Sequence, residues 1–114
     1  MELKEIKLPL SEELKNLKGV YFLFDENKIL LYIGKTCDFR ERLNAHLKNK
    51  KRVKPEDILN KKTSVTSQVP FNSVKYYYFI EILDELERRK QELRYIKLFK
   101  PGFNKPYLFD SWRE

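Results

Sequence analysis

Two apolar segments on either side of one short polar turn constrain the fold of this chain more than any other feature. Residues 19–25 and 28–34 are rich in aliphatic and aromatic side chains, which is typical of β-strands. The turn between them, DENK at 25–28, contains an asparagine, a residue that tolerates a positive φ. The sequence therefore predicts a β-hairpin.

A turn closed on residues 26–27 also predicts the register of this hairpin. Tyr21 would then face Tyr32 across the two strands, and Gly19 would face Gly34. Two facing glycines would leave the backbone open to a ligand. A cross-strand aromatic pair also stabilises many sheets by about 0.2–1 kcal/mol, so the hairpin alone favours a structural role for the tyrosines. The face of the tyrosines would also carry Leu23 and Leu30.

Three segments have helical patterns. Residues 11–17 form a short turn with Ser11 as N-cap, and a longer helix runs from its cap Asp38 to about residue 50. A third helix runs from Asp84 to about residue 100, where a Pro-Gly pair stops it. The residues expected to face inward are Leu14 and Leu17, then Phe39, Leu43 and Leu47, and finally Leu86, Leu93 and Ile96.

The rest of the chain adds one strand and one insertion. Residues 74–82 read as a third strand, in which consecutive tyrosines alternate between faces. Residues 51–73 form a loop-rich insertion, in which Pro55 fits the first position of a helical turn. The expected fold is α+β (an α/β sandwich), a single domain over 1–114 with a small, mainly antiparallel three-stranded sheet flanked by helices.

Composition limits the cellular setting. No apolar run approaches the roughly 20 residues that span a bilayer, and the acidic and basic N-terminus lacks the apolar core of a signal peptide. The single cysteine, Cys37, excludes an internal disulfide and a cysteine-rich zinc site. We therefore expect a reducing, cytoplasmic location.

The charge balance favours a polyanionic partner. The 24 Lys and Arg residues exceed the 17 Asp and Glu residues, which gives a net charge of +7. Much of the excess lies in the segment KNKKRVK, and such a patch gains affinity for nucleic acid by counterion release. Charge alone fits a solvated lysine-rich face at least as well as a polyanionic partner. The candidate phosphate-binding residues are Lys48, Lys50, Lys51, Arg52 and Lys54.

An ordered set of motifs follows the chain. Gly19-Val20-Tyr21 and Tyr32-Ile33-Gly34 are followed by Lys35 and then by Arg42 and His46, which lie four apart on one face of the predicted helix. This arrangement resembles the GIY-YIG nuclease family, with valine in place of isoleucine in the first triplet. The segment ELRYIKLFKPGFN resembles the glutamate-bearing helix of that family and the turn that ends in its asparagine, so the resemblance covers residues 19–104.

The resemblance implies the groups that bind metal and phosphate. Glu92 would hold a single Mg²⁺ or Mn²⁺ ion, which keeps several waters, and Asn104 would be the accompanying polar residue. Arg42 would present its planar fork of donors to the phosphate oxygens. Without the resemblance, Glu92 would read as an exposed helix acid and Asn104 as a turn residue.

The general base is the hardest role to assign. Tyr21 is expected to activate the water and Tyr32 to position water or phosphate, and the resemblance permits the reverse. A free tyrosine has a pKa near 10, so a nearby cation such as Lys35 would have to favour tyrosinate. His46 is an alternative acceptor for the proton of a tyrosine hydroxyl.

The predicted function is hydrolysis of DNA phosphodiester bonds by a metal-dependent endonuclease that acts on duplex or branched DNA. The alternatives are a non-catalytic nucleic-acid-binding module of the same fold and a nuclease that acts on RNA. Target choice would come from the insertion, from DNA structure, from a homodimer or from a partner protein. The residues do not distinguish repair, restriction and mobile-element roles.

Overall fold

The computed structural model describes residues 2–48, 73–101 and 104. Within these residues no helix has the length and apolar character needed to cross a membrane. The elements, in chain order, are β1 (Lys4–Glu5), the 3-10 helix η1 (Glu12–Leu14), β2 (Gly19–Phe24), β3 (Leu30–Thr36), α1 (Phe39–Lys48), β4 (Tyr76–Glu81) and α3 (Glu85–Phe99). The predicted Pro55 turn and the insertion up to residue 72 lie outside the described residues.

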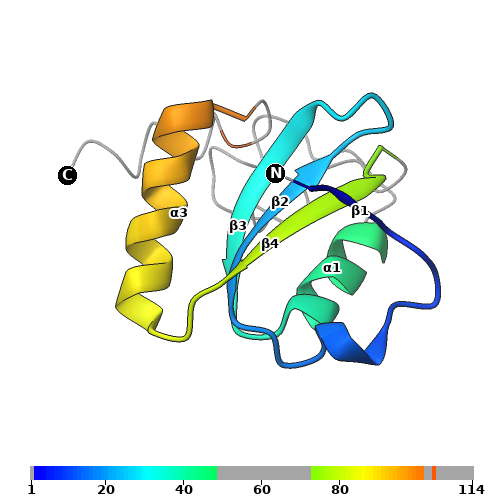
Figure 1. Cartoon of the computed structure of the whole chain (residues 1–114), viewed down its shortest axis with the longest axis horizontal. Helices are drawn as coiled ribbons and strands as arrows, with labels where there is room; N and C mark the ends of the chain where they lie inside the picture. Colours follow the sequence, from blue (N-terminus) through cyan, green and yellow to red (C-terminus); the bar gives the residue numbers. More distant parts are fainter. Residues whose placement is uncertain (1, 49–72, 102–103, 105–114) are drawn as a thin grey trace.

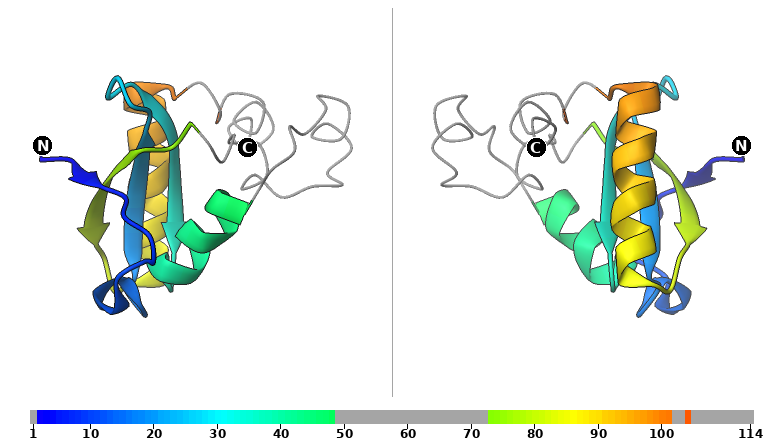
Figure 2. Two further views of the ribbon diagram at one scale, coloured as in Figure 1. Left: turned by 90° about the vertical axis from the view of Figure 1, so that its right-hand side faces the viewer. Right: turned by 90° about the vertical axis from the view of Figure 1, so that its left-hand side faces the viewer.

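An antiparallel sheet lies between two helices. The strand order is β1-β4-β2-β3, and α1 and α3 cover opposite faces of the sheet (Figures 1 and 2). The α+β architecture is confirmed, but the sheet has 4 strands rather than three. The extra strand, β1, has only 2 exposed, charged residues. A pattern of alternating hydrophobicity could not predict β1, because this strand is defined only by its pairing with β4.

The register of the hairpin differs from the prediction by two residues. Tyr21 lies opposite Gly34, not opposite Tyr32, and Gly19 lies opposite Thr36. Side chains alternate along a strand with a period of two, so this shift leaves each tyrosine on its predicted face. The predicted face is therefore right and the predicted Tyr21–Tyr32 ladder pair is wrong.

The turn between β2 and β3 explains the shift. The Asp25 carboxylate accepts hydrogen bonds from the backbone N–H groups of Asn27 and Ile29, each at 2.9 Å. The positive φ of 63° falls on Lys28 rather than on Asn27. A register irregularity at residues 23–24 adds to the longer turn, so a two-residue closure does not describe this hairpin.

Each face of the sheet has its own apolar core. On the face of α1, Leu47 packs against the buried residues Tyr21, Leu23, Tyr32, Phe39 and Leu43. On the face of α3 the buried residues are Val20, Phe22, Phe24, Ile33 and Ile96. The predicted stripe of α1 is confirmed. Leu30, predicted beside the tyrosines, packs on the α3 face because the irregularity at 23–24 changes the alternation.

The predicted caps of both long helices are confirmed. The Asp38 carboxylate accepts the Glu41 N–H at 3.3 Å, and the Asp84 carboxylate accepts the Glu87 N–H at 2.9 Å. Lys100 ends α3 in the left-handed region with φ of 48°. The Asp38 and Asp84 carboxylates thus satisfy backbone N–H groups that have no partner within the first turn of each helix.

The buried face of α3 differs in part from the predicted one. Ile96 is buried as expected, but Leu86 is 70% exposed. Arg88 is buried instead, and its guanidinium donates to the carbonyl groups of Ile82 at 3.1 Å and Leu83 at 2.8 Å. Arg88 thus provides hydrogen bonds to the backbone carbonyls of the segment before α3. A pattern of apolar residues could not predict its burial, because arginine is charged.

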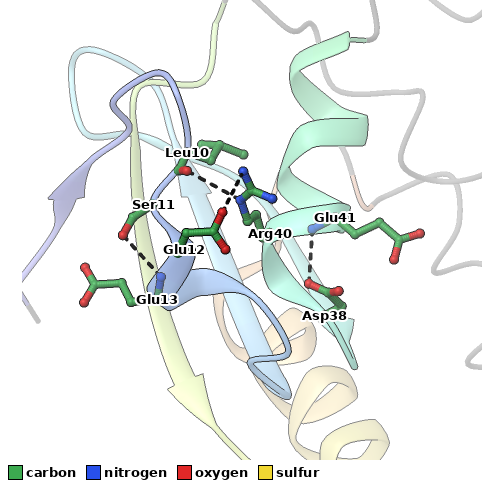
Figure 3. Close-up of polar contacts among 7 residues, drawn as sticks. All are labelled: Leu10, Ser11, Glu12, Glu13, Asp38, Arg40 and Glu41. Carbon is green, nitrogen blue, oxygen red and sulfur yellow. Dashed lines mark hydrogen bonds and ion pairs between the residues drawn. The ribbon is translucent and has the colours of Figure 1, made fainter.

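The predicted turn near the N-terminus is a single 3-10 turn. The Ser11 hydroxyl accepts the Glu13 N–H at 3.3 Å, so the predicted cap is confirmed (Figure 3). Leu14 is buried and Leu17 packs partly buried against the same core, as predicted.

This N-terminal segment holds the start of α1. Figure 3 shows Arg40 reaching from α1 to the Leu10 carbonyl, at 3.4 Å, and to the Glu12 carboxylate, at 3.7 Å. The Asn16 N–H donates to the Asp38 carboxylate at 3.2 Å. The helix that carries Arg42 and His46 is therefore anchored at its first turn by contacts far apart in sequence.

Candidate active site

Tyr21 lies directly over Gly34. A Cβ built at Gly34 would stand 2.5 Å from both Cζ and Oη of Tyr21, and one at Gly19 would meet the backbone carbonyl of Ile80. The two glycines thus make room for protein atoms and are themselves buried, so they do not expose the backbone as predicted. Because Gly34 has no side chain, Tyr21 of the first triplet can approach the backbone of β3 closely.

Tyr21, Tyr32 and His46 form a buried polar cluster beneath α1. The Tyr21 hydroxyl and His46 Nε2 are joined by a hydrogen bond of 2.9 Å, and Tyr21 also has a side-chain hydrogen bond with Tyr32. The ring centroids of Tyr21 and Tyr32 are 6.0 Å apart, and those of Tyr32 and His46 are 5.2 Å apart. The structure therefore brings both tyrosines and the single histidine together.

Burial raises the pKa of the Tyr21 hydroxyl. Tyr21 is only 1% exposed, and the loss of hydration outweighs the opposing effects of the Arg42 charge and the Tyr32 hydrogen bond, while the Glu92 charge raises the pKa further. A cation does favour the tyrosinate form of Tyr21, but it is Arg42 rather than the expected Lys35, and burial outweighs it so that the neutral phenol is favoured. Lys35 instead acts on Glu92.

The outer edge of β3 holds the two residues from the second half of the chain. The Ile33 N–H donates to Asn104 Oδ1 at 2.9 Å, and Asn104 Nδ2 donates to the Ile33 carbonyl at 3.0 Å. Glu92, from α3, accepts a hydrogen bond from the backbone of Lys35. The side chains of Asn104 and Glu92 thus form hydrogen bonds with backbone groups of β3 that would otherwise be free to pair with a further strand.

The Glu92 carboxyl group lies among cations. Its burial raises its pKa, whereas the charge and backbone N–H of Lys35 and the charges of Arg42 and Arg89 oppose this increase. Lys35 lies on the opposite face of β3 from Tyr32 and Gly34, as predicted from its position in the strand. Glu92 is therefore partly desolvated and faces more than one positive charge.

Arg42 acts electrostatically on both the tyrosine cluster and Glu92. It is exposed on α1, and its charge acts both on the Tyr21 hydroxyl and on the Glu92 carboxyl group. The tyrosines belong to the core on the α1 face of the sheet, whereas Glu92 lies on α3. The two helices cover opposite faces (Figure 2). The candidate site therefore lies at the β3 edge, where the two faces meet.

The donor set fits a hydrated ion better than a closed metal centre. Among residues 2–48, 73–101 and 104, no three His, Cys, Asp or Glu side chains are grouped as metal ligands. Glu92 is the carboxylate of this edge, and one carboxylate with several retained waters is a usual protein environment for Mg²⁺. Glu92 therefore fits a single divalent ion of this kind.

The side chain of Lys48 and all of Lys50, Lys51, Arg52 and Lys54 lie outside the described part of the chain, so their nucleic-acid role stays a prediction. Arg89 was not predicted to lie near the site. Its spacing of three residues before Glu92 on a helix was the available signal.

Comparison with known proteins identifies the family of this chain. Residues 17–107 match the GIY-YIG catalytic domain. The curated relatives include UvrABC system protein C of Helicobacter pylori (strain J99), 32% identical over 99 residues, which are 83% of this chain and 16% of that protein. The corresponding protein of Caldicellulosiruptor saccharolyticus is 29% identical over 100 residues, 85% of this chain and 15% of that protein. The chain thus spans about one sixth of the length of these relatives.

A solved structure has the same fold. The GIY-YIG N-terminal endonuclease domain of UvrC from Thermotoga maritima, bound to magnesium as its catalytic divalent cation, superposes with a TM-score of 0.52 at 20% sequence identity. The match covers 83% of this chain and 99% of that domain. The predicted fold class is therefore confirmed.

Proposed function

The chain belongs to the GIY-YIG family of catalytic domains, and from this premise we propose that it is a metal-dependent endonuclease that hydrolyses DNA phosphodiester bonds. The observation that carries the proposal is the arrangement at the β3 edge. The phenol of Tyr21, the charge of Arg42 and the carboxyl group of Glu92 influence one another there, although they come from three different elements. A binding module has no need for this combination.

Tyr21 is the proposed residue that activates the water. Because burial keeps its hydroxyl protonated, Tyr21 must release its own proton as it accepts one. His46 Nε2, 2.9 Å from the Tyr21 oxygen, can receive that proton when the neutral imidazole carries its own proton on Nδ1. Tyr32, hydrogen-bonded to Tyr21, positions the water or the phosphate.

Arg42 and Glu92 are assigned to the phosphate and the metal. The exposed guanidinium of Arg42 donates to non-bridging phosphate oxygens, where charge increases during hydrolysis. Glu92 holds a single Mg²⁺ or Mn²⁺ ion, and this ion supplies charge stabilisation for the phosphate and the leaving oxygen when bound. Lys35 orients the Glu92 carboxylate through its backbone N–H. Asn104 supports the strand between Tyr32 and Gly34.

The remaining assignments are also proposals. Residues 1–114 form a single catalytic domain with its core at 19–104, and the basic segment from Lys48 to Lys54 holds flanking phosphates of duplex or branched DNA. Neutralising Lys50, Lys51 and Arg52 would then flatten the salt dependence of binding, and an unchanged slope would place those contacts elsewhere. A homodimer or a partner protein supplies target choice, in a cytoplasmic, DNA-associated setting.

Cleavage of supercoiled plasmid tests the proposed function. Wild-type protein is incubated with plasmid and either Mg²⁺ or Mn²⁺, beside Glu92→Ala and the control Glu87→Gln, which changes an exposed acid of the same helix. The wild type and Glu87→Gln should nick or linearise the plasmid, and Glu92→Ala should not. Chelation with EDTA should stop both active proteins.

Two outcomes would contradict the proposal. If no protein cuts plasmid or branched DNA while all of them retard it in a gel, the chain is a binding module. If matched RNA is cut and DNA is not, the substrate class is RNA.

A further inference from the structure

We propose that Arg89 is a phosphate-binding residue of this site, which holds the nucleic-acid strand on the α3 side of Glu92. The inference rests on the proposed function and adds to it a substrate contact on the helix that carries Glu92. It concerns the sugar–phosphate backbone and not the bases.

Helix geometry places Arg89 next to Glu92. The two residues are three apart within α3 (Glu85–Phe99), so they lie on one face of the helix, one turn from each other. The two side chains interact electrostatically. Arg89 is exposed, so its guanidinium is accessible to a ligand approaching the β3 edge.

Arg89 makes no ion pair within 4 Å with another described residue. The ion pairs within 4 Å in the described part of the chain are Arg40 with Glu12 and Lys75 with Glu5, and neither involves Arg89. By contrast, the preceding residue, Arg88, is buried and donates to two backbone carbonyls. Of two consecutive arginines, one is structural and the other presents its donors to solvent beside the site.

The charge balance identifies the ligand chemistry. Lys35, Arg42 and Arg89 surround one carboxyl group, so positive charge exceeds negative charge even when Glu92 is ionised. A site of this kind attracts phosphate groups, and arginine binds phosphate through two parallel hydrogen bonds. Arg42 belongs to α1 and Arg89 to α3, and the charges of both act on Glu92, so two guanidinium groups from different helices are available to phosphates of one strand.

Equilibrium binding to a fluorescein-labelled DNA duplex, measured by anisotropy in EDTA over a range of salt concentrations, tests the inference. Arg89→Gln should weaken binding to unrelated sequences alike and reduce the slope of log K against log salt by about 1. Arg89→Lys should retain the slope because it keeps the charge. Arg94→Gln is the matched control, since Arg94 lies on another face of α3 and contacts Gln91 and the Tyr95 ring.

The outcomes separate this inference from the proposed function. The phosphate contact would be overturned if the salt slope of Arg89→Gln equalled that of the wild type, or if Arg94→Gln reduced the slope by the same amount. Either result would count even if the wild type cuts DNA. A reduced slope specific to Arg89→Gln would support it even if no cleavage is found. Absence of wild-type binding in EDTA would overturn the phosphate contact, whereas the nuclease is judged separately by plasmid cleavage with Mg²⁺ or Mn²⁺.

If Arg89 only balanced the charge of Glu92, its replacement would change the pH dependence of cleavage and leave the salt slope unchanged. That result would also overturn the inference. The comparison is made on the full chain, with thermal unfolding of each variant as a check that the fold is intact.

Discussion

The phenol ring of Tyr21 occupies the space in which a side chain at Gly34 would stand. The two residues are cross-strand partners in the β2–β3 ladder, and a Cβ at position 34 would lie 2.5 Å from the Tyr21 hydroxyl oxygen. The two sequence triplets are therefore complementary, since the glycine of one makes room for the tyrosine of the other. The position of the hydroxyl, and its hydrogen bond to His46, depend on this absence of a side chain.

Gly34→Ala should separate catalysis from folding. The added methyl group displaces the phenol and breaks the hydrogen bond to His46, so we expect at least about a 100-fold loss of plasmid nicking and a destabilisation of about 1–3 kcal/mol. Urea denaturation measures the second effect. Gly19→Ala should be more destabilising, because its methyl group meets the Ile80 backbone, which cannot rotate away. Normal nicking by Gly34→Ala would contradict the role of this contact.

Tyr21→Phe should abolish cleavage and leave DNA affinity nearly intact, because it removes the hydroxyl and keeps the ring. We expect a loss of about 100-fold or more, the usual size of a proton-transfer contribution. Single-turnover nicking and anisotropy measure the two quantities. Tyr76→Phe, on the opposite face of the sheet, is the control and should be fully active. Full activity in Tyr21→Phe would show that another residue is the general base.

The raised pKa of Tyr21 predicts a loss of stability at alkaline pH. Above pH 10, the unfolded chain ionises this tyrosine and the folded chain does not, so the unfolded state binds fewer protons and unfolding becomes easier as pH rises. The stability difference between wild type and Tyr21→Phe should fall by about 1.4 kcal/mol per pH unit there. Urea denaturation between pH 9 and pH 11 (about one unit on each side of the ordinary tyrosine value) measures it. A constant difference would show that the phenol ionises in the folded chain.

Asn104→Ala should loosen β3 at its outer edge. The substitution removes the partners of both the Ile33 N–H and the Ile33 carbonyl, at a cost of about 2–4 kcal/mol for two buried groups. Hydrogen exchange of the Ile33 amide should accelerate, and nicking should fall with it. Asn104→Asp, which accepts from the N–H but cannot donate to the carbonyl, should also be destabilised. An unchanged exchange rate together with lost cleavage would favour a direct role in catalysis.

The raised pKa of Glu92 predicts that metal binding weakens early on acidification. The protonated carboxyl group does not bind Mg²⁺, so the affinity for the ion should begin to fall at a pH above the ordinary glutamate value of 4.5. Below the actual pKa, affinity should decrease about tenfold per pH unit. Mn²⁺ binding followed by water proton relaxation measures this directly. Glu92→Gln should not bind, and a midpoint at or below 4.5 would contradict the burial of this group.

Much of the architecture could be predicted from local signals. The hairpin strands, the caps Asp38 and Asp84, the apolar stripe of α1 and the shared face of the tyrosines all depend on residues close in sequence. Local spacing also predicted Arg42 and His46 one turn apart on α1, although the structure exposes Arg42 and buries His46. These features follow from backbone propensity and side-chain periodicity, which need no knowledge of the rest of the chain.

The sequence by itself determined the strand face that Tyr21 and Tyr32 share, and through the family resemblance it proposed which residues carry the chemistry. Only the tertiary structure decided the register of Tyr21 against Gly34, the existence of β1 and the burial that keeps the Tyr21 hydroxyl protonated. It alone also brought Arg89 and Lys35 to Glu92. These properties arise from pairing and desolvation between segments far apart in the chain, and no periodicity within one segment encodes them.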